Sequence, residues 1–275
     1  MRSVRAVALA LSVLAALVWS LAPYLWQFVT SVKPSEQLAS LPPLLPSRVV
    51  WSHYATVFTE QPFGRFLWNS FVIAGVSTAA SLALALPAAF ALAKLPMRAR
   101  GLWLGFFLSV SMLPPIATVS PLYLLIGVLG LRDTHAGLIL PYTTYTLPLA
   151  VWVLTSYLRE LPDDLYRSAR VDGCSPTQAL LRVFLPLSLP GLFTTAILVF
   201  IFAWNEFLLA LTFTATERSR TVPVAIVLFP GLHEVPWGEI AAASIVVTVP
   251  LLLLVFLFQR RIVSGLTSGA LRGGS

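Results

Sequence analysis

The residues Leu67–Ala93, LWNSFVIAGVSTAASLALALPAAFALA, decide the class of fold. They contain no charged side chain, and as a helix rising about 1.5 Å per residue they are long enough to cross the hydrocarbon core of a bilayer. A soluble domain has no interior able to bury so long an apolar helix on every side. This stretch therefore predicts a membrane-spanning helix.

Five further apolar stretches follow the same pattern. They cover residues 6–29, 102–129, 136–158, 191–213 and 240–258. Each is close to or above the roughly 20 residues that a spanning helix needs. We expect the adjacent Pro114 and Pro115 to kink the helix of residues 102–129. The predicted fold class is an all-α polytopic membrane protein with six transmembrane helices.

The composition supports this class. Hydrophobic residues make up 57% of the chain, charged residues only 11%, and the mean hydropathy is +0.85. Soluble proteins carry roughly 25% charged residues. The net charge of +7 is explained by arginines that set topology, so we expect no nucleic-acid partner. The single cysteine, Cys174, excludes an intrachain disulfide and a cysteine-based metal cluster.

Basic residues predict the orientation of the chain. With the N-terminus in the cytoplasm, twelve of the 18 Lys and Arg residues fall in inside segments, which agrees with the positive-inside rule. The first apolar stretch is read as an uncleaved helix rather than a signal peptide. We therefore expect one transmembrane domain over residues 1–275, with both termini, a loop at 159–190 and a tail at 259–275 in the cytoplasm.

The loop at 159–190 contains the signals of two short helices. Asp163 and Asp164 favour a helix start, and Gly173 suits a left-handed C-cap. Ser175 can cap a second helix together with Gln178. We expect Pro186 to end that helix before the fifth span. A helix pair of this kind either docks in a groove of a partner protein or lies on lipid headgroups.

This loop resembles the cytoplasmic EAA loop of binding-protein-dependent ABC importer permeases. The family motif reads Glu-Ala-Ala, three residues, Gly, nine residues, then a hydrophobic residue, a spacer and Leu-Pro. The matching positions here are Arg167, Ser168, Ala169, Gly173, Val183, Leu185 and Pro186. The resemblance implies that the loop is a coupling helix seated in a cleft of an ATPase subunit. The residues implied in this contact are Asp163, Asp164, Arg167, Ala169, Asp172, Gly173, Leu185 and Pro186.

The first motif position departs from the family. Arg167 stands where the family usually has an acid that faces a basic surface of the ATPase. A cation there would repel such a surface. We expect Asp163 or Asp164 to make the contact instead, or the ATPase to carry a changed charge.

The C-terminal segment 258–272 looks like the tail of carbohydrate-importer permeases of the maltose and trehalose type. The segments 31–34 and 202–210 extend the likeness. The resemblance implies that Ser264, Gly265 and Gly269 reach the ATPase dimer. It also implies a second permease, an ATPase dimer that binds ATP and Mg, an extracytoplasmic binding protein that delivers a sugar, and a bacterial inner membrane with its lipid. The chain itself is expected to bind no cofactor.

The polar residues inside the spans are candidates for a substrate pathway. Glu206 is the one acidic residue within an apolar stretch, and Trp204 and Asn205 stand next to it. An acid, an amide and an aromatic ring can bind sugar hydroxyls and ring faces. Tyr142 and Tyr145 can line the same path. The alternative for all five residues is hydrogen bonding and packing between helices.

Catalytic and metal-binding patterns are missing from the sequence. It has no Gly-rich phosphate loop, no Ser/His/Asp set in a plausible order and no metal-ligand cluster. We therefore expect a permease that is not an enzyme. The alternatives are an importer permease for a solute other than a sugar and an intramembrane enzyme.

Overall fold

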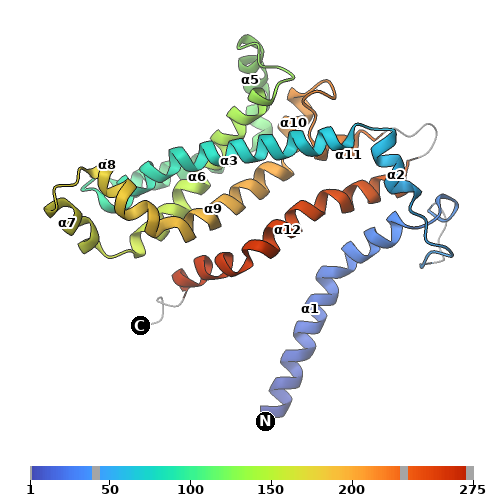
Figure 1. The fold of residues 1–275 in the computed structure, drawn as a ribbon, viewed down its shortest axis with the longest axis horizontal. Helices are drawn as coiled ribbons and strands as arrows, with labels where there is room; N and C mark the ends of the chain where they lie inside the picture. Colours follow the sequence, from blue (N-terminus) through green and yellow to red (C-terminus); the bar gives the residue numbers. More distant parts are fainter. Residues whose placement is uncertain (1, 39–43, 230–234, 271–275) are drawn as a thin grey trace. The chain divides into compact units, whose positions relative to one another are not determined.

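The structure, a computed structural model, describes residues 2–38, 44–229 and 235–270, which form helices joined by turns and loops (Figure 1). No strand occurs within these ranges, and the predicted all-α class is confirmed. In chain order, the α-helices are α1 (Arg2–Ser31), α2 (Ser52–Thr59), α3 (Phe63–Lys94), α4 (Arg100–Ser111), α5 (Pro115–Val128), α6 (His135–Glu160), α7 (Asp163–Val171), α8 (Pro176–Ala179), α9 (Leu185–Asn205), α10 (Leu208–Phe213), α11 (Val222–Val227) and α12 (Trp237–Ala270). A 3-10 helix, η1 (Ser35–Gln37), and a π-helix, η2 (Leu180–Phe184), complete the set.

Five helices of the described chain are long and apolar enough to cross a membrane. They lie at Arg5–Ser31, Phe63–Lys94, His135–Glu160, Pro176–Asn205 and Trp237–Phe258. The remaining predicted span, residues 102–129, is a pair of shorter helices, α4 and α5, bent by 85° at the break between them. Six spans result if this broken pair counts as one.

The bend between α4 and α5 is sharper than a kink within one helix. Pro114 has φ −64° and ψ 127°, and Pro115 begins α5. A proline forces the residue before it out of the helical region and into the extended one. The two consecutive prolines therefore separate the apolar stretch 102–129 into two helices.

The fifth span begins earlier than predicted, and the expectation that Pro186 ends the preceding helix is wrong. Helix continues from Pro176 through η2 and α9 to Asn205. Proline lacks an N–H group and its ring presses on the carbonyl four residues before it. A π-helical turn precedes this proline, in which the N–H of Leu185 bonds to the carbonyl of Leu180, five residues back.

The chain forms two compact units. The first contains residues 1–64 and 225–250. Its buried centre is His53 in α2, whose Nε2 lies 2.9 Å from the carbonyl oxygen of Lys33 and whose Nδ1 lies 2.9 Å from Oε1 of Glu239. A carbonyl can only accept, so Nε2 carries the proton. A Cβ at Gly238 would lie 2.5 Å from this ring, and the close approach therefore requires glycine.

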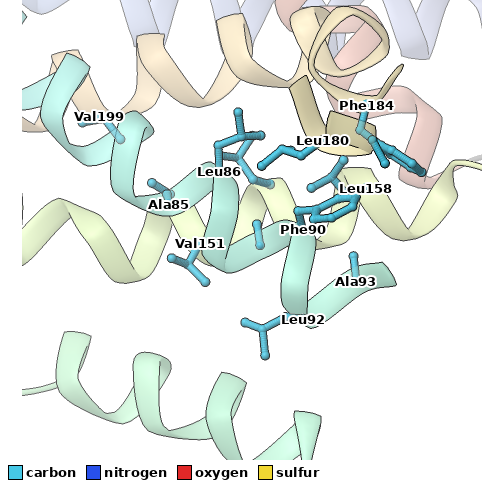
Figure 2. Close-up of a cluster of buried hydrophobic side chains, with 14 of the residues drawn as sticks. Ala85, Leu86, Phe90, Leu92, Ala93, Val151, Leu158, Leu180, Phe184 and Val199 are labelled. Carbon is cyan, nitrogen blue, oxygen red and sulfur yellow. The ribbon is translucent and has the colours of Figure 1, made fainter. Parts of the chain in front are cut away.

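The second unit contains residues 65–224 and 251–275. Figure 2 shows its hydrophobic core, with Phe90 of α3, Leu158 of α6 and Phe184 of η2. The rings of Phe90 and Phe184 meet edge to face with centroids 5.1 Å apart. Ala169 of α7 and Ala179 of α8 are buried in the same cluster. The predicted cytoplasmic loop is therefore packed on the ends of three long helices.

Close contact between α6 and α9 depends on one glycine. A Cβ at Gly191 would lie 2.6 Å from Cγ of Tyr157 and 2.8 Å from the neighbouring ring carbons. Such a distance cannot be kept, so either the ring or a helix must move. Small residues at helix crossings allow this kind of approach in membrane proteins.

We predict that Gly191→Ala lowers the free energy of unfolding by about 1–3 kcal/mol, the usual cost of overpacking a tight contact. Thermal unfolding of the detergent-solubilised protein, followed by scanning fluorimetry, measures the effect. Gly75→Ala in α3 is the matched control, because a Cβ at Gly75 meets open space. Equal melting temperatures for the two variants would contradict the proposed crossing.

Candidate functional site

Helix α7 begins and ends as its residues predict. Pro162 precedes its first residue, and Asp163 and Asp164 occupy the first turn. At the C-terminal end Gly173 adopts φ +81°. Its N–H bonds to the carbonyl of Arg170, and the N–H of Cys174 bonds to the carbonyl of Ala169. These two bonds form a Schellman motif, which confirms the predicted left-handed cap.

Helix α8 starts with the predicted capping box. The N–H of Gln178 donates to Oγ of Ser175 over 3.2 Å, and the N–H of Ser175 donates to Oε1 of Gln178 over 2.8 Å. Nη1 of Arg170 donates to the carbonyl of Cys174 over 2.7 Å and stiffens the turn between the two helices. The segment 163–179, called here the α7–α8 hairpin, is thus a compact and locally capped unit.

Aromatic packing fastens the hairpin to the helices beneath it. The ring of Tyr166 in α7 lies 5.9 Å from that of Phe90 and 6.5 Å from that of Phe184. Leu165 packs against the same core. These contacts hold α7 to α3 and η2, so the hairpin cannot move independently of them.

A buried lysine adds an ionic link that the sequence did not reveal. Lys94, the last residue of α3, has a side chain 1% exposed. Its Nζ donates to Oδ1 of Asp163 over 2.6 Å and to the carbonyl of Leu161 over 2.5 Å, and lies 6.0 Å from the ring centroid of Phe184. In the sequence, Lys94 looked like one of several charges that set topology. Only its burial distinguishes it from them.

The bond from Lys94 lowers the pKa of the Asp163 carboxyl below its ordinary value of 3.8. A carboxyl whose pKa is lowered by folding stabilises the fold at pH values above the pKa that it has in the unfolded chain. This contribution is lost as the pH falls through the lowered pKa. The link is therefore intact at neutral pH and is lost only in acid. Asp163, predicted to face a partner, is bound to Lys94 through Oδ1, and its side chain is 69% exposed.

The outward side of α7 combines charge with one apolar residue. Nη1 of Arg167 lies 3.5 Å from Oδ1 of Asp164, and both side chains are largely exposed. Val171 is 87% exposed, and Asp172 is exposed beside it. Of the other residues expected at the coupling site, Ala169 is buried, whereas Leu185 is half-buried and Pro186 exposed at the start of α9. Asp163, Asp164 and Arg167 are thus the exposed residues of the site that lie on α7 itself.

Glu206 stands at the break between α9 and α10. Its Oε2 accepts from the hydroxyl of Tyr142 over 2.6 Å and from the N–H of Ala210 over 3.1 Å, and its Oε1 accepts from the N–H of Leu209 over 2.9 Å. Glu206 has extended backbone angles, φ −67° and ψ 127°, which end α9. The carboxylate thus caps α10 and ties it to α6.

An open hollow of about 580 Å³ lies beside this break. It is lined by Pro115, Ile116, Ile201, Phe202, Asn205, Glu206, Phe207 and Leu208. Asn205 is exposed, and its Nδ2 donates to the carbonyl of Ile201 over 2.8 Å. Two of the five predicted pathway residues, Asn205 and Glu206, therefore share this hollow.

The other three predicted pathway residues are not among those that line this hollow. Trp204 is 2% exposed and stacks on Phe200, with ring centroids 5.6 Å apart. Tyr142 is 1% exposed and bonded to Glu206, and the hydroxyl of Tyr145 is hydrogen-bonded to Oγ1 of Thr118. Ser264, Gly265 and Gly269, predicted to reach a partner, fall in the last turns of α12, where the structure describes only the course of the helix.

Comparison with known proteins identifies a family and close relatives. Residues 81–268 match the family described as binding-protein-dependent transport system inner membrane component. A trehalose transport system permease protein of Mycobacterium tuberculosis is 46% identical over 93% of both chains. A trehalose/maltose transport system permease protein of Thermococcus litoralis is 42% identical over 91% of both chains. A sulfoquinovosyl glycerol transport system permease protein of Agrobacterium fabrum is 41% identical over 94% of this chain and 90% of its own.

One solved structure shares the fold. It is a bacterial ABC transporter involved in the import of the acidic polysaccharide alginate. The matching chain aligns with a TM-score of 0.77 over 94% of this chain and 98% of its own, at 21% sequence identity. At this identity the likeness shows the fold alone.

We predict that Lys94→Met loosens α7, because it removes the cation that holds Asp163 and the Leu161 carbonyl. Amide hydrogen exchange in α7 should become about tenfold faster, the ratio expected for the loss of one charge-assisted hydrogen bond. Mass spectrometry of the exchanged protein in detergent measures this change.

The matched control is Arg98→Met, which removes an exposed cation four residues further along the chain. It should leave exchange in α7 unchanged. If Lys94→Met behaves as this control does, the Lys94–Asp163 bond does not hold the hairpin.

Proposed function

The chain belongs to the family of binding-protein-dependent transport system inner membrane components, and we propose that it is the permease subunit of an ATP-driven importer for a sugar or an oligosaccharide. As a member of this family it is a non-catalytic, multi-pass inner membrane protein. The sugar class is supported by three relatives above 40% identity, whose names refer to trehalose, maltose and a sulfoquinovosyl glycerol. The structural observation that carries the proposal is the α7–α8 hairpin, held rigidly on three long helices and exposed on its outward face.

The hairpin is the proposed docking site of an ATPase subunit, which binds ATP and Mg. Val171 offers an apolar contact, and the Asp164–Arg167 pair offers one charge of each sign. Exposed pairs of this kind contribute little stability and are easily rearranged. Because Arg167 replaces the usual acid and Asp163 is bound to Lys94, Asp164 is the acid of α7 that is best placed to meet a basic ATPase surface.

Movement of the docked ATPase would reach the membrane through two contacts. The ring of Tyr166 transfers it to Phe90 and Phe184, and the Lys94–Asp163 link transfers it to the end of α3. Packed cores transmit displacement because they are dense and resist compression. The hairpin, α3, α6 and α9 would then tilt together, which is the motion that alternating access requires.

The remaining partners follow from the orientation that the basic residues predict. The hairpin and both termini would face the cytoplasm, and a binding protein would deliver substrate to the opposite side. A second permease would complete the pathway, since one chain of this kind encloses only half of it. The last turns of α12, with Ser264, Gly265 and Gly269, are proposed to approach the ATPase dimer.

The hollow beside Glu206 is the proposed wall of the substrate pathway. Asn205 supplies a donor and an acceptor, and Phe202 supplies a flat apolar ring, which together suit a sugar. Glu206 has a structural role in this proposal, because three hydrogen bonds from the protein occupy its two oxygens.

We predict that reconstitution of the four components in proteoliposomes gives ATP-dependent uptake of a mono- or oligosaccharide. The components are this chain, the second permease, the ATPase and the extracytoplasmic binding protein. A panel of labelled trehalose, maltose, other sugars, amino acids and phosphate distinguishes the proposal from an importer for another solute. Uptake restricted to a non-sugar would overturn the sugar class, and uptake that persists without the ATPase would overturn the mechanism.

We predict different results for the two polar residues at the break. Glu206→Gln places an NH₂ group among three donors and should lower the free energy of unfolding by about 1–3 kcal/mol. Asn205→Ala should leave the melting temperature unchanged and raise the substrate concentration for half-maximal uptake. Melting temperature and uptake, measured on the same preparations, separate the two roles. An uptake curve for Asn205→Ala that matches the unmodified protein would contradict the pathway wall.

A further inference from the structure

A second polar hollow, of about 360 Å³, lies where three separate segments of the second unit meet. The segments are the start of α3, the start of α6 and the stretch that follows α10. The lining residues are Arg65, Trp68, Asn69, Asp133, Thr134, His135, Arg218 and Ser219. None of them belongs to the coupling loop or to the hollow beside Glu206.

Asn69 holds the three segments in place. Its Nδ2 donates one hydrogen to the carbonyl of Arg218 over 3.1 Å and the other to the carbonyl of Arg220 over 2.9 Å. Oδ1 of Asn69 therefore remains as an acceptor, and Nε2 of His135, 3.0 Å away, must carry the proton that it receives. Asn69 is 2% exposed, so these bonds are shielded from water.

Asp133 stiffens the same hollow and is saturated by the bonds that it accepts. Its Oδ1 accepts from the N–H of Ala215 over 2.9 Å, from the N–H of Thr216 over 3.1 Å and from Oγ of Ser219, and its Oδ2 accepts from Oγ1 of Thr216 over 2.6 Å. Burial acts to raise the pKa of Asp133, but the hydrogen bonds from Ser219, Thr216 and Ala215 lower it to about 2. The carboxylate is thus committed to the loop 214–219.

The two arginines of the hollow are in a different situation. Arg65 and Arg218 are exposed, and the structure records no side-chain hydrogen bond or ion pair for either within the described residues. Trp68 beside them is 62% exposed. Arg65, Trp68 and Arg218 thus line one hollow whose backbone is already fixed by hydrogen bonds, and two guanidinium groups in one hollow can bind a carboxylate together.

The position of the hollow indicates where the carboxylate comes from. Its three segments fall at 65–69, 133–135 and 218–219, which the distribution of basic residues predicts to lie on the extracytoplasmic side. Arg132, stacked on Tyr123 at 4.0 Å, and Arg220, 5.9 Å from the ring centroid of Phe66, add positive charge nearby. The same segments also carry two acids, Asp133 and Glu217, so the face is net positive rather than uniformly positive. A net charge on a docking face steers a partner of the opposite sign.

We propose that this hollow is a socket for an acidic side chain of the extracytoplasmic binding protein, in which Arg65 and Arg218 clamp the carboxylate. The inference rests on the proposed function, because it requires such a protein to dock on this face. Trehalose and maltose, the sugars in the names of two of the relatives, carry no charge for the two arginines to bind, so the hollow is assigned to the binding protein rather than to the substrate. Anionic lipid headgroups are the competing ligand, and the experiment separates them.

The test uses the complete transporter in proteoliposomes of neutral lipid. ATPase rate is measured against the concentration of the binding protein, for the unmodified chain and for Arg65→Glu, Arg218→Glu and the double variant. Arg48→Glu is the matched control, since Arg48 is an exposed arginine of the same predicted face outside the hollow. Unchanged melting temperatures establish that each variant is folded. If a charge-reversal variant does not fold, the double variant Arg65→Gln, Arg218→Gln takes its place.

The expected result is a rise of about tenfold in the half-saturating concentration of binding protein for the double reversal, and no rise for Arg48→Glu. Raising the salt concentration should weaken stimulation of the unmodified transporter and have little effect on the double variant. Equal half-saturating concentrations for the double variant and the control would overturn the socket. So would a difference that appears only when anionic lipid is added, which would assign the arginines to lipid.

The same measurement distinguishes a failure of the proposed function from a failure of the arginine socket. If the binding protein does not stimulate the unmodified transporter, the proposed function is wrong. If it stimulates the unmodified transporter and the arginine variants alike, only the socket is wrong.

Discussion

The packing of Phe184 is the interaction on which the second unit depends. This ring lies in the π-helical turn between α8 and α9, and it meets Phe90 of α3 and Tyr166 of α7. The π turn ends two residues before Pro186, and the helix continues through the proline. A helix broken at Pro186 would free the α7–α8 hairpin from the core. Because the helix is unbroken, the hairpin and the long helices form one packed body.

Buried and half-buried polar groups hold the ends and breaks of helices in this protein. Lys94 ties α3 to α7, Glu206 ties α10 to α6, and Asp133 ties the loop after α10 to the start of α6. In an apolar protein an unsatisfied polar group costs several kcal/mol, so such groups occur where backbone donors or acceptors need partners. These residues therefore connect segments that the apolar spans alone would leave unconnected.

The exposed polar groups show a complementary arrangement. The face of α7 carries Asp164, Arg167 and Val171, and the hollow at the other helix ends carries Arg65 and Arg218. Both surfaces are built on capped or hydrogen-bonded scaffolds, so little ordering is required when a partner binds. In the proposed importer these two surfaces are where the ATPase and the binding protein act on the permease.

The sequence by itself determined the features that depend on neighbouring residues. The apolar stretches, the left-handed cap at Gly173 and the capping box of Ser175 with Gln178 were predicted because each depends on local composition or on residues at most a few positions apart. The bend at Pro114 and Pro115 was expected as a kink, although its sharpness was not.

Only the tertiary structure decided the roles of the isolated polar and charged residues. Lys94 finds Asp163 across 69 positions and Tyr142 finds Glu206 across 64, while the amide of Asn69 reaches the carbonyl of Arg218 across 149. A single charge in a span or at its end has the same local pattern whether it faces a pathway, a partner or another helix. Which of these it meets is set by how distant segments pack, and that packing is not encoded in any one stretch of the chain.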